Sequence, residues 1–331
     1  MCVTFFTLSQ PGYKLILAFN RDEFLDRPTL PAHWHNFNSS PTLTPSPYKP
    51  NTLTDLCPRE KKESDDGGRV LSGLDRGKAE GGTWLGISKD LKVALLTNIA
   101  CIRPAPGVQP LSPPPSRGKL LREFLSPSPF TSSQLETQSY ISSHFPTAGD
   151  YEGFNLLLFS LSAERSIGYL TNRPSPSCID LTSSLCGGEH GQMRCVGLSN
   201  SPLDEKWPKV QQGEKNMEKS LREWDEKGEG EDGLVERMFG VLSPSRPITS
   251  DVDLTLSTTI PPIKLGEDLF LNTDPQNTRA RWKGTRTATV IIVKDSGETT
   301  YVERDIWVIG QDGEPKKGED ERRFKFVGEE K

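Results

Sequence analysis

The chain has 331 residues, of which 33% are hydrophobic, so it can bury a substantial core in one large domain or two smaller ones. Its 40 Lys and Arg residues face 45 Asp and Glu residues, which gives a net charge of -5. This balance lacks the basic excess with which proteins bind nucleic-acid phosphates, and we expect no nucleic-acid partner.

The N-terminal region and the cysteines indicate the compartment. The longest apolar stretch near the N-terminus is Leu15–Phe19, which is too short for a transmembrane segment or for the apolar part of a signal peptide. No CxxC pair occurs, so the sequence indicates neither a zinc site nor a disulfide framework. We expect a cytoplasmic protein with reduced thiols and no metal.

Short apolar segments joined by turns are typical of β-hairpins. They cover residues 2–8 with 14–20, 83–88 with 92–98, 154–161 with 167–172, and 287–293 with 299–308. Four further segments are typical of helices, namely 118–125, 132–145, 207–224 and 233–242. Many hairpins with a few helices predict an α+β fold, in which stacked antiparallel sheets are covered by helices.

Three polar segments stand apart from these elements. Residues 39–68 contain scattered prolines, mixed charge and few aliphatic side chains, so apolar burial cannot offset the entropy of ordering them. We predict a disordered insertion there and a second one, rich in proline, at 104–116. Residues 311–331 read as a charged flexible tail. The remainder, 1–310, is expected to form a single domain.

Four polar residues, Asn20-Arg21-Asp22-Glu23, directly follow the second predicted strand. Side chains alternate along an extended chain, so Arg21 should face away from Asn20 and Asp22, and Phe19 should share the side of Arg21. Asn20 and Asp22 could merely cap a turn, and Arg21 and Glu23 could form a surface ion pair of little consequence. Their occurrence together with a cysteine at position 2 favours a functional site.

Seven blocks in this order resemble the NRDE family, also called the transport and Golgi organisation protein 2 family. The blocks are MCVTFF, AFNRDEFLDRPT, SGLDRGKAEGGTWLGIS, ALLTN, GFNLLLF, GLSNSPLDEKWPKV and GTRTATVIIV. The resemblance implies a cytosolic protein linked to Golgi organisation, protein secretion and heme mobilisation, associated with the Golgi or with mitochondria. It also implies a small amphipathic ligand, either heme or an acyl-CoA.

The same layout is similar, more distantly, to the choloylglycine hydrolase branch of the N-terminal-nucleophile amidases. That likeness implies an αββα fold and removal of Met1, after which Cys2 attacks an amide with its own α-amino group as base. It also implies that Asp22 orients the amine, that Asn98 and Asn200 supply oxyanion donors, and that Arg286 polarises the site. The sequence departs from the amidases at Phe19, where they carry arginine.

Two functions therefore remain open. One is a non-catalytic carrier that holds heme or another amphipathic metabolite in an amidase-like cleft; the other is an N-terminal cysteine amidase. Cys2 could also be only a small buried side chain at the start of a strand. No cofactor is required, and a transient heme would lie on an apolar cleft, because no histidine belongs to a CxxCH motif and Cys57-Pro58 is a common dipeptide. The sequence does not indicate an oligomeric state.

Overall fold

The structure is a computed structural model that describes residues 1–37, 67–77, 81–99, 113–127, 133–161, 165–186, 194–265 and 281–329. The strands are β1 (Val3–Thr7), β2 (Tyr13–Phe24), β3 (Thr29–His35), β4 (Val70–Asp75), β5 (Leu85–Ser88), β6 (Lys92–Asn98), β7 (Phe154–Ser160), β8 (Ser166–Thr171), β9 (Ser177–Asp180), β10 (Cys195–Leu198), β11 (Ile263–Leu265), β12 (Arg281–Lys294), β13 (Glu298–Asp305), β14 (Trp307–Ile309), β15 (Pro315–Lys317) and β16 (Glu321–Val327). The helices are α1 (Gly118–Leu125), α2 (Ser133–His144), η3 (Phe145–Asp150, a 3-10 helix), α3 (Thr182–Cys186), α4 (Pro208–Glu226), α5 (Glu231–Leu242) and α6 (Asp251–Leu256).

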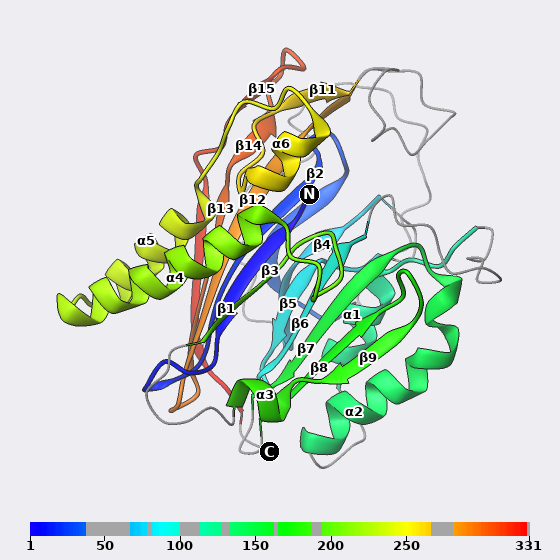
Figure 1. Cartoon of the computed structure of the whole chain (residues 1–331), viewed down its shortest axis with the longest axis vertical. Coiled ribbons are helices and arrows are strands. Elements are labelled where there is room, and N and C mark those ends of the chain that lie inside the picture. Colours follow the sequence, from blue (N-terminus) through cyan, green and yellow to red (C-terminus); the bar gives the residue numbers. More distant parts are fainter. Residues whose placement is uncertain are drawn as a thin grey trace.

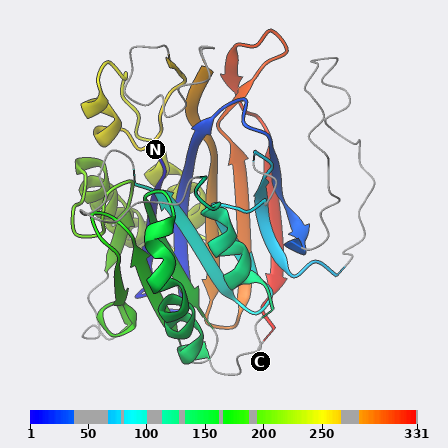
Figure 2. The same cartoon turned by 90° about the vertical axis from the view of Figure 1, so that its right-hand side faces the viewer.

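Two antiparallel sheets are stacked face to face, and helices cover their outer faces (Figures 1 and 2). The first sheet has the strand order β10-β1-β2-β12-β13-β16, with β11 added to β12, and the second has the order β3-β4-β5-β6-β7-β8-β9. Helices α4 and α5 pack on the first sheet, whereas α1 and α2 pack on the second. The expected α+β fold of stacked sheets covered by helices, αββα, is confirmed.

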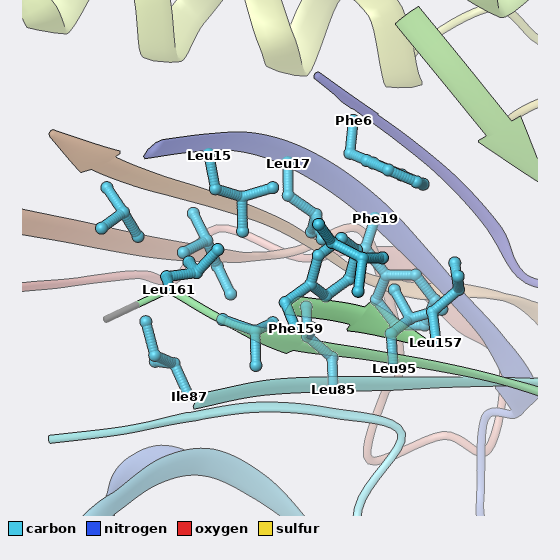
Figure 3. Packing of buried hydrophobic residues seen from close by; sticks show 14 of the residues in the cluster. Phe6, Leu15, Leu17, Phe19, Leu85, Ile87, Leu95, Leu157, Phe159 and Leu161 are labelled. Atoms are coloured by element: carbon cyan, nitrogen blue, oxygen red, sulfur yellow. The ribbon is translucent and has the colours of Figure 1, made fainter. Parts of the chain in front are cut away.

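Strand β2 is buried on both faces, which explains its uninterrupted apolar run. Leu17 and Phe19 point into the layer between the sheets, beside side chains of β6 and β7 (Figure 3), whereas Ala18 faces the layer of α4 and α5. This alternation continues past Phe19, so that the neighbours Asn20 and Arg21 enter different layers. The core of the protein thus fixes where the polar residues at the end of β2 point.

The predicted hairpins correspond to β1 with β2, β5 with β6, β7 with β8, and β12 with β13. The predicted helices correspond to α1, α2, α4 and α5. Several strands were not predicted, among them β3, β4, β10 and β16. In the described part of the chain, no helix combines the length and the apolar character needed to cross a membrane.

The C-terminal segment differs from the predicted flexible tail over 311–331. Residues 321–327 form β16, which pairs with β13 and completes an edge of the first sheet. Phe324 and Phe326 pack against the core between the sheets, and Arg322 forms an ion pair with Asp305 at 2.8 Å. The charged residues alternate with these aromatic ones, so a strand with one solvated face has the composition of a polar tail.

The two insertions predicted at 39–68 and 104–116 lie outside the described residues, apart from Gly67, Gly68 and residues 113–116. The chain enters and leaves the first of them at neighbouring points. Asn36 Nδ2 donates to the backbone O of Gly67 at 3.0 Å, and the N–H of Arg69 donates to Asn36 Oδ1 at 3.1 Å.

We therefore expect that residues 38–66 can be replaced by a short Gly-Ser linker without loss of the fold. The ends already lie side by side, and loop length contributes little to stability, so the melting temperature should change by less than about 3 °C. Thermal unfolding followed by circular dichroism measures this. A drop of more than about 10 °C would mean that the segment packs on the domain.

Candidate functional site

The α-amino group of the chain is buried against a carboxylate. The Met1 amine donates to Oδ2 of Asp22, and Thr285 Oγ1 donates to Oδ1 of the same carboxylate at 2.5 Å. The Asp22 side chain is fully shielded from solvent. Burial lowers the pKa of the amine below its ordinary value, and the negative charge of Asp22 opposes this shift. The start of β1 and the end of β2 are thus joined by a buried ion pair.

Cys2 lies beside this ion pair and belongs to the core cluster between the sheets, which also contains Phe19. Its Sγ donates to the backbone O of Asp22 at 3.8 Å, and only 3% of the residue is exposed. Burial raises the pKa of the thiol, and the nearby amine partly offsets the shift. The thiol is therefore protonated at neutral pH, so Cys2 needs a base before it can act as a nucleophile.

The loop after β10 brings Asn200 to the same place. Asn200 Nδ2 donates to the backbone O of Asn98, the last residue of β6, and Ser199 Oγ donates to the backbone O of Cys2 at 2.8 Å. Asn98 takes part through its backbone carbonyl in this contact. The two sheets are thus tied together directly at Cys2, and the structure brings Cys2, Asp22, Asn98 and Asn200 into one cluster.

Two buried polar residues hold this loop, and the sequence analysis did not identify either. Thr97 Oγ1 donates to the backbone O of Ser199 at 2.5 Å, and Asn155 Nδ2 donates to the backbone O of Ser201 at 2.9 Å. Neither Thr97 nor Asn155 is exposed at all. An asparagine inside the apolar run FNLLLF is the signal that could have revealed this role, because a buried amide requires partners.

The four residues Asn20 to Glu23 make different contacts. Asn20 Nδ2 donates to the backbone O of Leu242 at 3.0 Å and of Thr258 at 3.1 Å, which ties β2 to the outer helical layer. Arg21 faces the other layer, with its guanidinium 5.0 Å from the centre of a tryptophan ring. The predicted opposition of Arg21 to Asn20 is confirmed. Glu23 lines a cavity, and its charge raises the pKa of the Cys2 thiol.

This cavity has a volume of about 50 Å³, enough for a few water molecules. Its wall is mainly polar and comes from β2 and the turn after it, from the second sheet, and from the start of α1; it consists of Glu23, Arg27, Asp75, Thr83, Trp84, Leu96, Asn98, Ser116, Arg117 and Gly118. The apolar cleft expected for an amphipathic ligand is therefore not what these residues form. Among the described residues, no group of three or more His, Cys, Asp or Glu could hold a metal ion.

Arg286 does not join the cluster around Cys2. Its Nη1 donates to the backbone O of Arg27 at 2.6 Å and of Phe24 at 3.3 Å. Burial and the nearby charge of Arg21 lower the pKa of Arg286 to about 10. A β-bulge in β12 is the reason for this placement, because Thr285 instead pairs with Asp22 and contacts its carboxylate.

Arg117, at the start of α1, is a further site residue that the sequence analysis missed. Its Nη2 lies 3.1 Å from Glu152 Oε2, and its Nη1 donates to the backbone O of Gly153 at 3.0 Å. Burial lowers the pKa of Arg117, and the charges of Glu152, Glu23 and Cys2 partly oppose the shift. Gly82 lets α1 approach this closely, since a Cβ at Gly82 would lie 2.8 Å from backbone atoms of Gly118.

Known proteins resemble this chain over most of its length. A family model described as Transport and Golgi organisation 2 matches residues 1–46 and 58–307, so its gap falls within the insertion predicted at 39–68. The mouse protein named Transport and Golgi organization 2 homolog is 30% identical over 313 residues, which cover 92% of each chain. A bovine protein named Transport and Golgi organization protein 2 homolog is 30% identical over 315 residues, again 92% of each chain.

Solved structures give a weaker likeness. A mutant of a conjugated bile acid hydrolase from Clostridium perfringens aligns with a TM-score of 0.39 and 10% identity, over 99% of this chain and 98% of that one. Another variant of the same hydrolase aligns with a TM-score of 0.40 and 8% identity, over 100% of this chain and 98% of that one.

Proposed function

The chain belongs to the Transport and Golgi organisation 2 family, and we propose that it acts in transport and Golgi organisation by binding an amphipathic small molecule. The anionic end of this ligand enters the charged cavity beside Cys2. Heme, through its carboxylates, and an acyl-CoA, through its phosphates, both have such an end. The protein binds this ligand in the cytoplasm and thereby supports protein secretion.

The observation that carries the proposal is the position of Arg117 at the cavity, at the N-terminus of α1. The positive end of a helix dipole and an arginine together attract a carboxylate or a phosphate. The second cavity arginine, Arg27, is already neutralised, because it donates two hydrogen bonds to Asp75, at 2.9 and 2.7 Å. Arg117 pairs with Glu152, whose side chain is 50% exposed to water. An anion buried in the cavity would therefore compensate the charge of Arg117 better than this solvated carboxylate does.

The size of the cavity restricts which part of the ligand it holds. Pockets that enclose a drug-sized molecule have volumes of about 300 to 1,000 Å³, whereas this one has about 50 Å³. A carboxylate or phosphate group is of the right size, and the apolar body of heme or of an acyl chain is not. We infer that the body of the ligand lies outside the cavity.

Arg117→Gln should weaken binding of palmitoyl-CoA and of hemin at least about tenfold, because the charge-assisted hydrogen bonds to the anion are lost. Isothermal titration calorimetry measures this effect. Arg165→Gln is the matched control, since Arg165 forms an ion pair with the half-exposed Asp295 on the surface. Equal affinities of the wild type and Arg117→Gln for both ligands would refute the proposal.

A second candidate function is an N-terminal cysteine amidase, and the buried contact between the α-amine and Asp22 favours it. The proposal requires removal of Met1, so that Cys2 carries the terminal amine. The amine then takes the thiol proton while Sγ forms a bond to the amide carbonyl. The C–N bond breaks as the leaving amine accepts that proton, and water hydrolyses the thioester, which yields a carboxylic acid and restores the thiol.

A further inference from the structure

Lys209 is a buried lysine beside Cys2 that neither of these functions uses. It is the second residue of α4, and only 2% of it is exposed. Its Nζ donates to the backbone O of Met1 at 3.2 Å, so the first turn of α4 reaches the marked N-terminus (Figure 1). Lysine is rarely buried to this degree unless its charge is paired.

A lysine at this position does not stabilise α4. A positive charge in the first turn of a helix is repelled by the positive end of the helix dipole. Pro208, at the first position of α4, already favours a helix start without any charge. The position of Lys209 is therefore unfavourable for α4 itself, and its partners must offset the burial of the charge.

One partner of Lys209 is the ring of Trp207, whose centre lies 5.5 Å from Nζ, and the other partners are the groups of the N-terminal site. Burial lowers the pKa of Lys209 to about 8, while the negative charges of Asp22 and of a Cys2 thiolate favour its protonated form. The Met1 amine faces the same carboxylate. The Met1 amine thus contacts Asp22 directly, whereas Lys209 acts on Asp22 and Cys2 through its charge.

Two further charged groups act on this cluster. Lys283, on β12, lowers the pKa of the Met1 amine, and Glu23, on β2, raises the pKa of the Cys2 thiol. These groups oppose each other in their effect on a negative charge at Cys2. Lys209 lies on α4, whereas Lys283 and Glu23 lie on strands of the first sheet.

We propose that Lys209 is a positioning residue of the N-terminal site: its ammonium group holds the Met1 carbonyl oxygen and its charge stabilises the thiolate form of Cys2. Where Met1 has been removed, Asp22 and Cys2 remain as its charged neighbours. This role goes beyond the proposed function and does not depend on the ligand of the cavity.

The test is the pH profile of Cys2 alkylation by iodoacetamide between pH 6 and 10. Mass spectrometry of the N-terminal peptide separates Cys2 from the other cysteines and shows whether Met1 is present. Lys209→Gln keeps a hydrogen-bond donor but loses the charge, and Lys209→Arg keeps the charge. Lys119→Gln, on the exposed face of α1, is the control.

At pH 7 the wild-type Lys209 is protonated, so alkylation of Cys2 in Lys209→Gln should be up to about tenfold slower than in the wild type. The two rates should converge above pH 9, where the lysine is neutral. Lys119→Gln should match the wild type. Equal alkylation rates of Lys209→Gln and the wild type at pH 7 would overturn the proposal.

Lys209→Arg gives an independent result even where Lys209→Gln does not fold. Above pH 8 the wild-type lysine loses its proton, whereas arginine stays charged. Between pH 8.5 and 9.5, Cys2 should therefore react faster in Lys209→Arg than in the wild type. Equal rates in this interval would contradict a role of the charge.

Discussion

Asp22→Asn should lower the free energy of unfolding by about 3 kcal/mol at pH 6, because a buried ammonium group loses its counter-charge while the shape of the side chain is kept. The wild-type carboxylate accepts from the terminal amine and from Thr285, and its side chain is fully shielded from solvent. An amide can accept from Thr285 but cannot neutralise the amine. Urea unfolding of both proteins measures the difference.

The stability lost in Asp22→Asn should decrease as pH rises. The pKa of the buried Met1 amine is already lowered in the folded state, and loss of Asp22 lowers it further. Below about pH 8 the unfolded chain binds a proton at this amine more readily than the folded protein does, and this difference lowers the free energy of unfolding. The effect disappears as pH rises through the ordinary pKa of about 8, because the amine is then neutral in both states. The difference between the two proteins should therefore shrink at pH 9.

Asp295→Asn is the control for this experiment, since Asp295 is half exposed and pairs with Arg165 on the surface. It should change stability by less than about 1 kcal/mol at either pH. An equal loss in Asp22→Asn at pH 6 and pH 9 would mean that Asp22 acts through its shape and hydrogen bonds, and not through its charge.

Cys2→Ala should distinguish the two candidate functions, because it abolishes hydrolysis by an amidase but leaves ligand binding by a carrier nearly unchanged. If the protein only binds its ligand, the variant should keep the affinity for palmitoyl-CoA within about twofold, because Arg117 and α1 form the anion site. If the protein is an amidase, hydrolysis of an N-acyl substrate should fall to the background rate, because Sγ is the attacking atom.

Both activities are measured on the same preparations, after intact mass has established whether Met1 is present. Asp22→Asn is the second variant, and it should slow an amine-assisted hydrolysis while leaving ligand affinity nearly unchanged. Hydrolysis that persists undiminished in Cys2→Ala excludes the amidase proposal. A loss of affinity greater than about tenfold in Cys2→Ala would instead place the thiol in the binding site.

Much of the fold could be predicted because its central strands are buried on both faces. The apolar runs of β2, β7 and β12 mark these strands directly, and so the hairpins that contain them were found. The edge strand β16 was not predicted, because every second residue is exposed and three of these, Glu321, Arg323 and Lys325, are charged. Local composition does not distinguish such a strand from a polar tail.

The candidate site was predicted in part, for a reason that lies in chain topology. Side-chain alternation in β2 correctly separated Arg21 from Asn20, since that rule needs only the strand itself. The position of Arg286 depends on a bulge opposite Asp22, and nothing in the letters GTR indicates this bulge. Arg117 and Lys209 reach the site from the starts of two helices, so their proximity depends on how the layers pack and not on any spacing.

A crystal structure of the protein in complex with palmitoyl-CoA would show where the ligand binds. We expect a phosphate of the ligand within hydrogen-bond distance of Arg117, at the N-terminus of α1, with the acyl chain outside the cavity. A ligand bound elsewhere on the protein, with only water in the cavity beside Cys2, would contradict this expectation.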